Sequence, residues 1–133
     1  MFLRKFSEIQ KKGFWDLANM MVLADGEVVD SERKLLNEYK IELGHTEFEI
    51  GKFDTNIKKT ISSMKLNEKE KKELMFELIG VAYSDNNFDI TERKILQDIQ
   101  KELKLSDKEV SIIGKFVNSV LNIYSLIGEY FND

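Results

Sequence analysis

Residues 25–50 read DGEVVDSERKLLNEYKIELGHTEFEI, and residues 85–110 read DNNFDITERKILQDIQKELKLSDKEV. The two segments align without a gap at an offset of 60, and identical residues fall on charged positions, such as Glu32 on Glu92, as well as on apolar ones. Two unrelated amphipathic helices agree easily at apolar positions but not at charged positions too. The sequence therefore predicts an internal repeat, with a helical hairpin used twice.

Capping signals and apolar periods predict where the helices lie. Ser7 with Gln10 reads as a capping box, and Gly44 suits the residue that follows a helix. The expected helices cover residues 7–24, 30–43, 46–64, 67–82, 90–103 and 106–131, approximately, and no segment shows a strand pattern. We therefore expect an all-α bundle of six to seven helices in a single domain, residues 1–133. It is built from two pseudo-two-fold-related hairpin repeats, about 14–64 and about 74–131.

Composition excludes several classes of function. The chain has 20 Lys and Arg against 24 Asp and Glu, no cysteine, one histidine and no proline. A net charge of -4 does not attract nucleic acid. Thiolate metal sites and histidine-dependent hydrolase triads lack their residues, and no nucleotide-binding glycine motif is present. We therefore expect a protein that is not an enzyme.

The longest uncharged run, residues 116–128, is too short to span a bilayer. The apolar stretch 17–24 follows a basic N-terminus, but it belongs to the repeat and is interpreted as mature protein. We therefore expect a cytoplasmic protein without direct membrane insertion.

Four acids recur at equivalent places in the two repeats: Asp25 and Glu32 in the first, Asp85 and Glu92 in the second. Each Asp closes one helix and each Glu stands in the first turn of the next, so a tight turn can aim both carboxylates at one point. The spacing matches the back half of an EF-hand loop, while the acids of the front half are missing. If the turns converge, the four carboxylates suit one hard divalent cation: calcium, magnesium or manganese. Auxiliary ligands that do not obey the repeat are Glu27, Asp30, Asn87 and Asp89.

An alternative hypothesis gives these acids only a structural role. Asp-Gly is a common turn dipeptide, and acids at helix N-termini complete capping boxes. The protein is then a helical protein–protein interaction module. Its surface would be the last helix, whose apolar stripe runs from Val110 to Phe131. Any part that projects from the core, such as Tyr130 and Phe131, would bind a partner or form a homodimer.

The acidic turns also carry a resemblance. An apolar helix runs into Ala-Asp-Gly-Glu-Val at 24–28, Glu follows seven residues after the Asp, Arg-Lys-Leu-Leu comes next at 33–36, and a degenerate copy lies downstream. This pattern resembles the TerB-like family of tellurite-resistance proteins, which also includes the N-terminal domain of the membrane-anchored co-chaperone DjlA. The resemblance covers about residues 14–110 and implies a helical bundle. It also implies acids in both turns that bind a divalent metal, and a stress-response role through protein partners, some of them membrane-associated. Asn86 departs from the glycine usual at that position.

Overall fold

A computed structural model describes residues 1–24, 26, 28–45, 47–85 and 90–132. These residues form six α-helices and one short 3-10 helix, and no strand occurs among them. The elements are η1 (Leu3–Lys5), α1 (Glu8–Val22), α2 (Asp30–Leu43), α3 (Ile57–Met64), α4 (Glu68–Ser84), α5 (Ile90–Leu103) and α6 (Asp107–Asn132). The predicted all-α class is confirmed.

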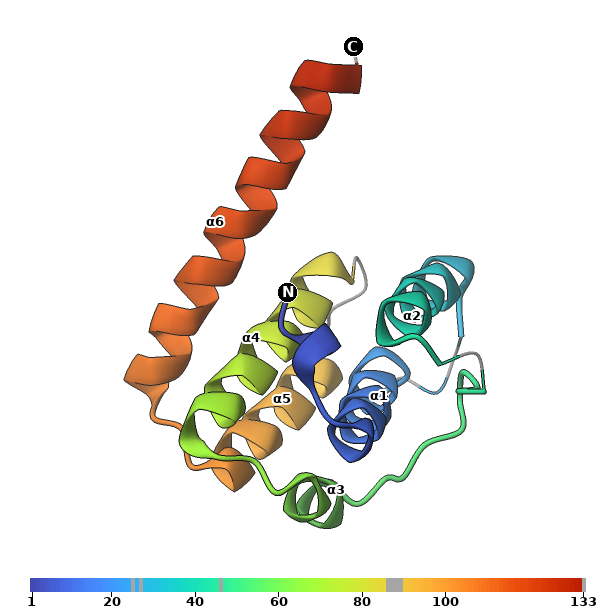
Figure 1. The fold of residues 1–133 in the computed structure, drawn as a ribbon, viewed down its shortest axis with the longest axis vertical. Coiled ribbons are helices and arrows are strands. Elements are labelled where there is room, and N and C mark those ends of the chain that lie inside the picture. The colour runs from blue at the N-terminus through green and yellow to red at the C-terminus, as the bar shows by residue number, and fades with distance from the viewer. Residues whose placement is uncertain (25, 27, 46, 86–89, 133) are drawn as a thin grey trace.

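Helix α1 forms the centre of the molecule. Every residue from 13 to 22 is buried, and α2, α3, α4 and α5 all pack around it (Figure 1). A helix that is buried on all sides is a core helix, in contrast to a surface helix with one apolar stripe. The large side chains of Phe14, Trp15 and Leu17 are fully buried there and anchor the surrounding helices.

Five helices begin and end close to where the sequence predicts them. Ser7 caps α1, and Asn67 caps α4 in a reciprocal box with Glu70. Helix α2 ends at Gly44, whose φ of 75° lies in the left-handed region that glycine adopts without strain. Local capping chemistry is sufficient to set these boundaries, because each cap satisfies backbone groups that the helix leaves unpaired.

The predicted helix over 46–64 is wrong in its first half. Helix α3 covers only Ile57–Met64 and is capped by Asn56. The side chain of Asp54 accepts a hydrogen bond from the Asn56 backbone N–H at 2.9 Å, and Gly51 has a left-handed φ of 87°. These polar turn residues offer the backbone an alternative to helical hydrogen bonds. The apolar spacing that suggested a helix instead arises from a non-helical segment that lies on the core, where Phe48 stacks on Trp15.

The internal repeat remains a prediction. Helices α2 and α5 have the same length and bounds at the offset of 60, and α1 and α4 begin at equivalent residues. Helices α3 and α6 do not follow the offset, since α3 has 8 residues and α6 has 26.

Helix α6 extends far beyond the rest of the molecule (Figure 1). Its first half packs on α4 through the buried side chains of Ile113 and Val117, and Glu109 pairs with Lys72 at 3.7 Å. The predicted apolar stripe continues past this contact, but Tyr124 and Phe131 are 65% and 74% exposed. By length and composition α6 qualifies as a helix that could cross a membrane. The expectations of a cytoplasmic location and of no membrane insertion therefore stay predictions.

The buried side chain of Asn19 holds the non-helical segment 47–56 against α1. This contact gives a test of where α3 begins. The Gly51 N–H donates to Asn19 Oδ1 at 3.0 Å, and Asn19 Nδ2 donates to the Trp15 carbonyl at 2.8 Å. Asn19→Ala leaves the Gly51 N–H without this acceptor, so we expect the free energy of unfolding to fall by about 1–3 kcal/mol. Chemical denaturation measures it. The exposed Asn37→Ala on α2 is the control and is expected to change stability by less than about 0.5 kcal/mol.

Candidate metal centre

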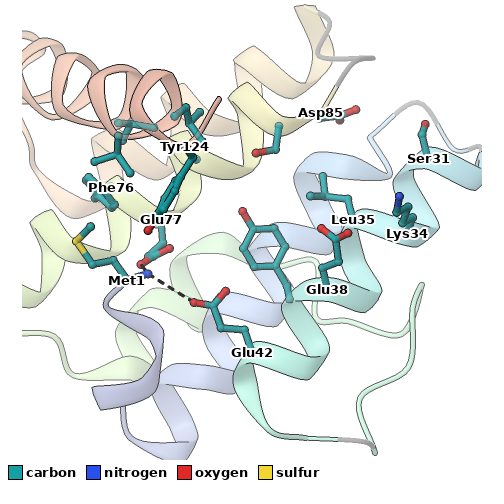
Figure 2. Close-up of a pocket in the computed structure, with 16 residues that line it drawn as sticks. Met1, Ser31, Lys34, Leu35, Glu38, Glu42, Phe76, Glu77, Asp85 and Tyr124 are labelled. Atoms are coloured by element: carbon teal, nitrogen blue, oxygen red, sulfur yellow. Dashed lines mark hydrogen bonds and ion pairs between the residues drawn. The ribbon is translucent and has the colours of Figure 1, made fainter. Parts of the chain in front are cut away.

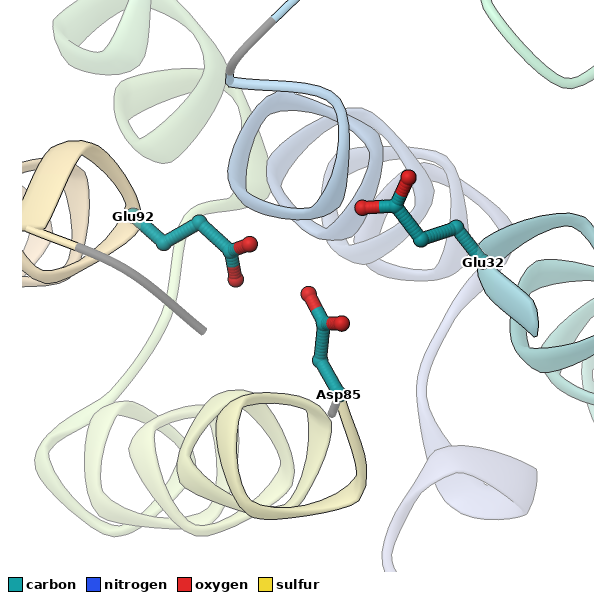
Figure 3. A group of neighbouring side chains, drawn as sticks. All are labelled: Glu32, Asp85 and Glu92. Carbon is teal, nitrogen blue, oxygen red and sulfur yellow. The ribbon is translucent and has the colours of Figure 1, made fainter. Parts of the chain in front are cut away.

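Three carboxylates from three different helix ends meet inside the molecule. Glu32 lies in the first turn of α2, Asp85 ends α4, and Glu92 lies in the first turn of α5. One oxygen of each carboxylate lies within 4.8 Å of those of the other two (Figure 3). The three residues are only 1%, 6% and 3% exposed. We call this group the acidic cluster.

The local backbone explains why Glu32 and Glu92 point inward. Both are the third residue of their helix. The first turn of a helix carries unpaired N–H groups and a partial positive charge, which favour an acid there. In α2 the N-cap is Val29, which has no side-chain acceptor, and Glu32 Oε1 accepts a hydrogen bond from the Val29 N–H at 3.3 Å. Glu32 therefore contributes to capping and faces the acidic cluster at the same time.

Asp85 reaches the cluster from the opposite direction. Its N–H bonds the Val81 carbonyl at 3.1 Å and closes α4, after which its backbone turns to extended angles, φ −90° and ψ 110°. Its carboxylate points toward the first turns of α2 and α5 (Figure 3). The tertiary packing of α2, α4 and α5 around α1 thus brings together residues more than fifty positions apart in sequence.

The other residues expected at this site divide into two groups. Asp30 is described, and it lies exposed in the first turn of α2, outside the acidic cluster. Asp25, Glu27, Asn87 and Asp89 lie outside the described residues. The structure therefore brings together three of the four acids that the repeat singled out.

The acidic cluster has the chemistry of a site for a hard cation. Three ionised carboxylates this close repel one another, and burial increases the cost of their charge. A divalent cation offsets both effects by supplying positive charge and direct oxygen coordination. Opposite oxygens around a calcium ion lie about 5 Å apart, because each bond is about 2.3–2.6 Å long. The three oxygens lie within 4.8 Å of one another, so one calcium ion can contact all of them, whereas magnesium accepts only a near-ideal octahedral arrangement.

An acidic groove that the sequence did not predict borders the cluster. It has a volume of about 730 Å³ and lies between α2 on one side and α4 and α6 on the other (Figure 2). Asp85 lines it, and so does Tyr39, whose pKa is raised first by burial and then by the charges of Glu77, Glu42 and Glu38. The four-residue spacing of Glu38 and Glu42 was the available sequence signal. Glu77 comes from a distant helix, so only packing brings it to the groove.

The chain matches a family described as Tellurite resistance protein TerB over residues 17–115. This chain belongs to the TerB family. The matched residues include the whole acidic cluster and end within α6, so that the exposed half of this helix lies beyond the matched region. Neither a curated protein nor a solved structure matches the chain. The resemblance found in the acidic turns is therefore confirmed at the level of the TerB family.

Removing one charge from the acidic cluster tests its electrostatics. We expect Asp85→Asn to raise the free energy of unfolding of the chelator-treated protein by about 1–2 kcal/mol. This is a fraction of the roughly 3 kcal/mol between two charges about 5 Å apart at an effective dielectric constant of about 20. Urea unfolding measures it, and Asp98→Asn on the half-exposed side of α5 is the matched control. A loss of stability in Asp85→Asn would show that the side chain acts mainly as a helix-end residue.

Proposed function

We propose that this TerB-family protein binds a divalent cation through Glu32, Asp85 and Glu92, and that it is not an enzyme. The observation that carries the proposal is the convergence of three buried carboxylates within 4.8 Å. Asp25 is the fourth acid by its place in the sequence repeat. Calcium, magnesium and manganese all prefer such oxygen ligands, and calcium accepts the widest range of coordination geometries.

The proposed cation links three helix ends. Glu32 and Glu92 belong to the first turns of α2 and α5, and Asp85 belongs to the end of α4. Coordination replaces repulsion between these ends with attraction to one shared centre. Because Asp85 also lines the acidic groove, the cation would fix the position of α2 against α4 and so the width of that groove. The binding of a protein partner in this groove would then depend on the metal.

Two features support binding rather than catalysis. The chain has no cysteine, and its single histidine, His45, pairs with Glu8 and Glu47 rather than with a nucleophile. The family description concerns resistance to tellurite, which is an anion, and an acidic cluster repels anions. The proposed ligand is therefore a cation, and a role in stress response would be exerted through the cation and protein partners rather than by capture of tellurite.

Thermal unfolding of the chelator-treated protein tests this function. Calcium, magnesium, manganese and zinc are added separately at up to millimolar concentration. A cation that binds only the folded state stabilises it by about 2.7 kcal/mol at a hundredfold excess over its dissociation constant, a rise of roughly 10 °C in melting temperature. We expect calcium to give the largest rise and Glu32→Gln/Glu92→Gln to lose it.

The matched control carries the same charge change on the same helices. Glu38→Gln/Glu102→Gln removes one acid each from α2 and α5 outside the acidic cluster. This variant is expected to keep the full response to the cation. If no cation raises the melting temperature of the wild type, the metal-binding function is wrong, and the acids serve only as turn and capping residues.

A second candidate function is that of a helical interaction module. It is favoured by a separate observation, the large exposed apolar side chains in the outer half of α6. The two functions are compatible, because the acidic cluster lies on α2, α4 and α5, whereas the exposed half of α6 extends beyond these helices (Figure 1).

A further inference from the structure

The exposed half of α6 carries more apolar surface than a soluble monomer ordinarily leaves in water. Phe116 is 60% exposed, Leu126 is 64% exposed and Tyr130 is 81% exposed. Large contiguous apolar patches of this kind mark sites of association. The large α6 side chains with substantial exposure are Ile112, Phe116, Ile123, Tyr124, Leu126, Ile127, Tyr130 and Phe131.

Six positions form a regular seam along the exposed side of α6. They follow one another in alternating steps of four and three residues, which is the spacing of the a and d positions of a coiled coil. We call this seam the outer stripe, and it is distinct from the positions of Ile113 and Val117, which are buried against α4. The outer stripe consists of Ile112, Phe116, Ser119, Ile123, Leu126 and Tyr130, and all six are exposed.

The rest of the α6 surface favours a protein partner over a membrane. A second regular row is polar throughout and consists of Lys115, Asn118, Asn122, Ser125 and Glu129. A lipid-spanning helix is typically apolar on all sides, and this polar row departs from that pattern. A helix that lies on a membrane surface usually has a polar face rich in Lys and Arg. Here that face carries one lysine and one glutamate, and the chain as a whole is negatively charged.

We propose that two copies of this chain associate through an antiparallel pairing of their α6 helices along the outer stripe. The stripe is self-complementary in this orientation. Ile112 of one copy faces Tyr130 of the other, Phe116 faces Leu126, and Ser119 faces Ile123, and each contact occurs twice about a two-fold axis. Both copies use the same surface, the outer stripe, so neither leaves it free for a third copy and the assembly is a closed dimer.

Charge complementarity selects the antiparallel orientation. Lys115 and Glu129 are the only charged residues between positions 110 and 132. Each directly precedes a residue of the outer stripe, Phe116 and Tyr130 respectively. In antiparallel helices such flanking positions face each other, so that Lys115 of each copy pairs with Glu129 of the other. A parallel pair gives these charges no such partner, because there the position of Lys115 faces Val120 of the other copy.

An apolar hollow lies where the end of the second helix would arrive. It has a volume of about 360 Å³, and Phe76, Ile112 and Phe116 are among its lining residues. In the antiparallel pair, Tyr130 of the second copy lies over Ile112 and thus beside this hollow. The exposed ring of Tyr130 in one copy therefore lies beside the apolar hollow of the other copy.

The outer stripe supplies much of the apolar area that a dimer needs. A fully buried aromatic side chain removes about 150–250 Å² from water, and the five apolar side chains of the outer stripe together offer on the order of 500 Å². A standard protein–protein interface buries about 800 Å² on each partner. Ile127, which stands beside the outer stripe, and the lining of the apolar hollow add to this area.

Sedimentation equilibrium of the full chain in chelator tests the dimer independently of any cation. We expect a dimer for the wild type and at least a roughly 30-fold weaker association for Ile123→Lys, the effect of a central interface residue. Ser125→Lys introduces the same charge on the polar row and is expected to remain dimeric. Both positions are exposed in the single chain, so circular dichroism should show unchanged helix content for both variants.

Chemical cross-linking tests the orientation, because the chain has no cysteine of its own. A mixture of Lys115→Cys and Glu129→Cys chains is expected to cross-link with a short bis-maleimide, since the two positions face each other. Either variant alone should not, because identical positions lie about 21 Å apart along the antiparallel pair. Cross-linking of each variant alone, and not of the mixture, would overturn the antiparallel orientation.

Two results would overturn the dimer itself. One is a monomer at all concentrations up to about 100 µM, since an interface of standard size is expected to be largely assembled there. The other is co-flotation of the monomer with phosphatidylcholine–phosphatidylglycerol vesicles, lost in Ile123→Lys, which would assign the outer stripe to lipid instead of to a second copy.

Discussion

The geometry of the acidic cluster depends on the packing of α2, α4 and α5 around one buried helix. These helices pack on α1, whose residues 13–22 are buried on all sides. That packing places the carboxylates of Glu32, Asp85 and Glu92 together away from water. Buried and clustered carboxylates cost free energy unless other groups offset their charge. The first turns of α2 and α5 supply part of this compensation, and the proposed cation would add to it.

The same packing shapes the neighbouring surface. Asp85 belongs both to the acidic cluster and to the lining of the groove between α2, α4 and α6 (Figure 2). A change in charge at the cluster therefore acts on the wall of the groove. The outer stripe of α6, in contrast, contributes none of its six residues to the lining of the groove, and the far part of this helix projects away from the bundle (Figure 1). Its proposed use for association needs no metal, so the two properties can be separated by experiment.

Capping chemistry explains which helix boundaries could be predicted from the sequence. Ser7, Asn67 and Gly44 set the ends of their helices through local hydrogen bonds and backbone freedom. Such signals involve residues close in sequence, so they can be recognised without the structure. The wrong prediction over 47–56 has the opposite cause. There an apolar spacing of three and four residues was produced by a segment that follows the core surface, held by the hydrogen bond between Gly51 and Asn19. Apolar periodicity does not distinguish these two arrangements when turn residues such as Asp54 and Asn56 interrupt it.

The sequence by itself determined the helical class, the TerB-like pattern and the positions of the acids relative to the helix ends. Only the tertiary structure decided that Glu32, Asp85 and Glu92 meet, and that the outer half of α6 stands in solvent. The physical reason is that spacing along a helix reports which face is apolar or charged, whereas the packing of other elements decides what that face meets. The stripe on α6 is continuous in sequence, yet α4 covers only its first half.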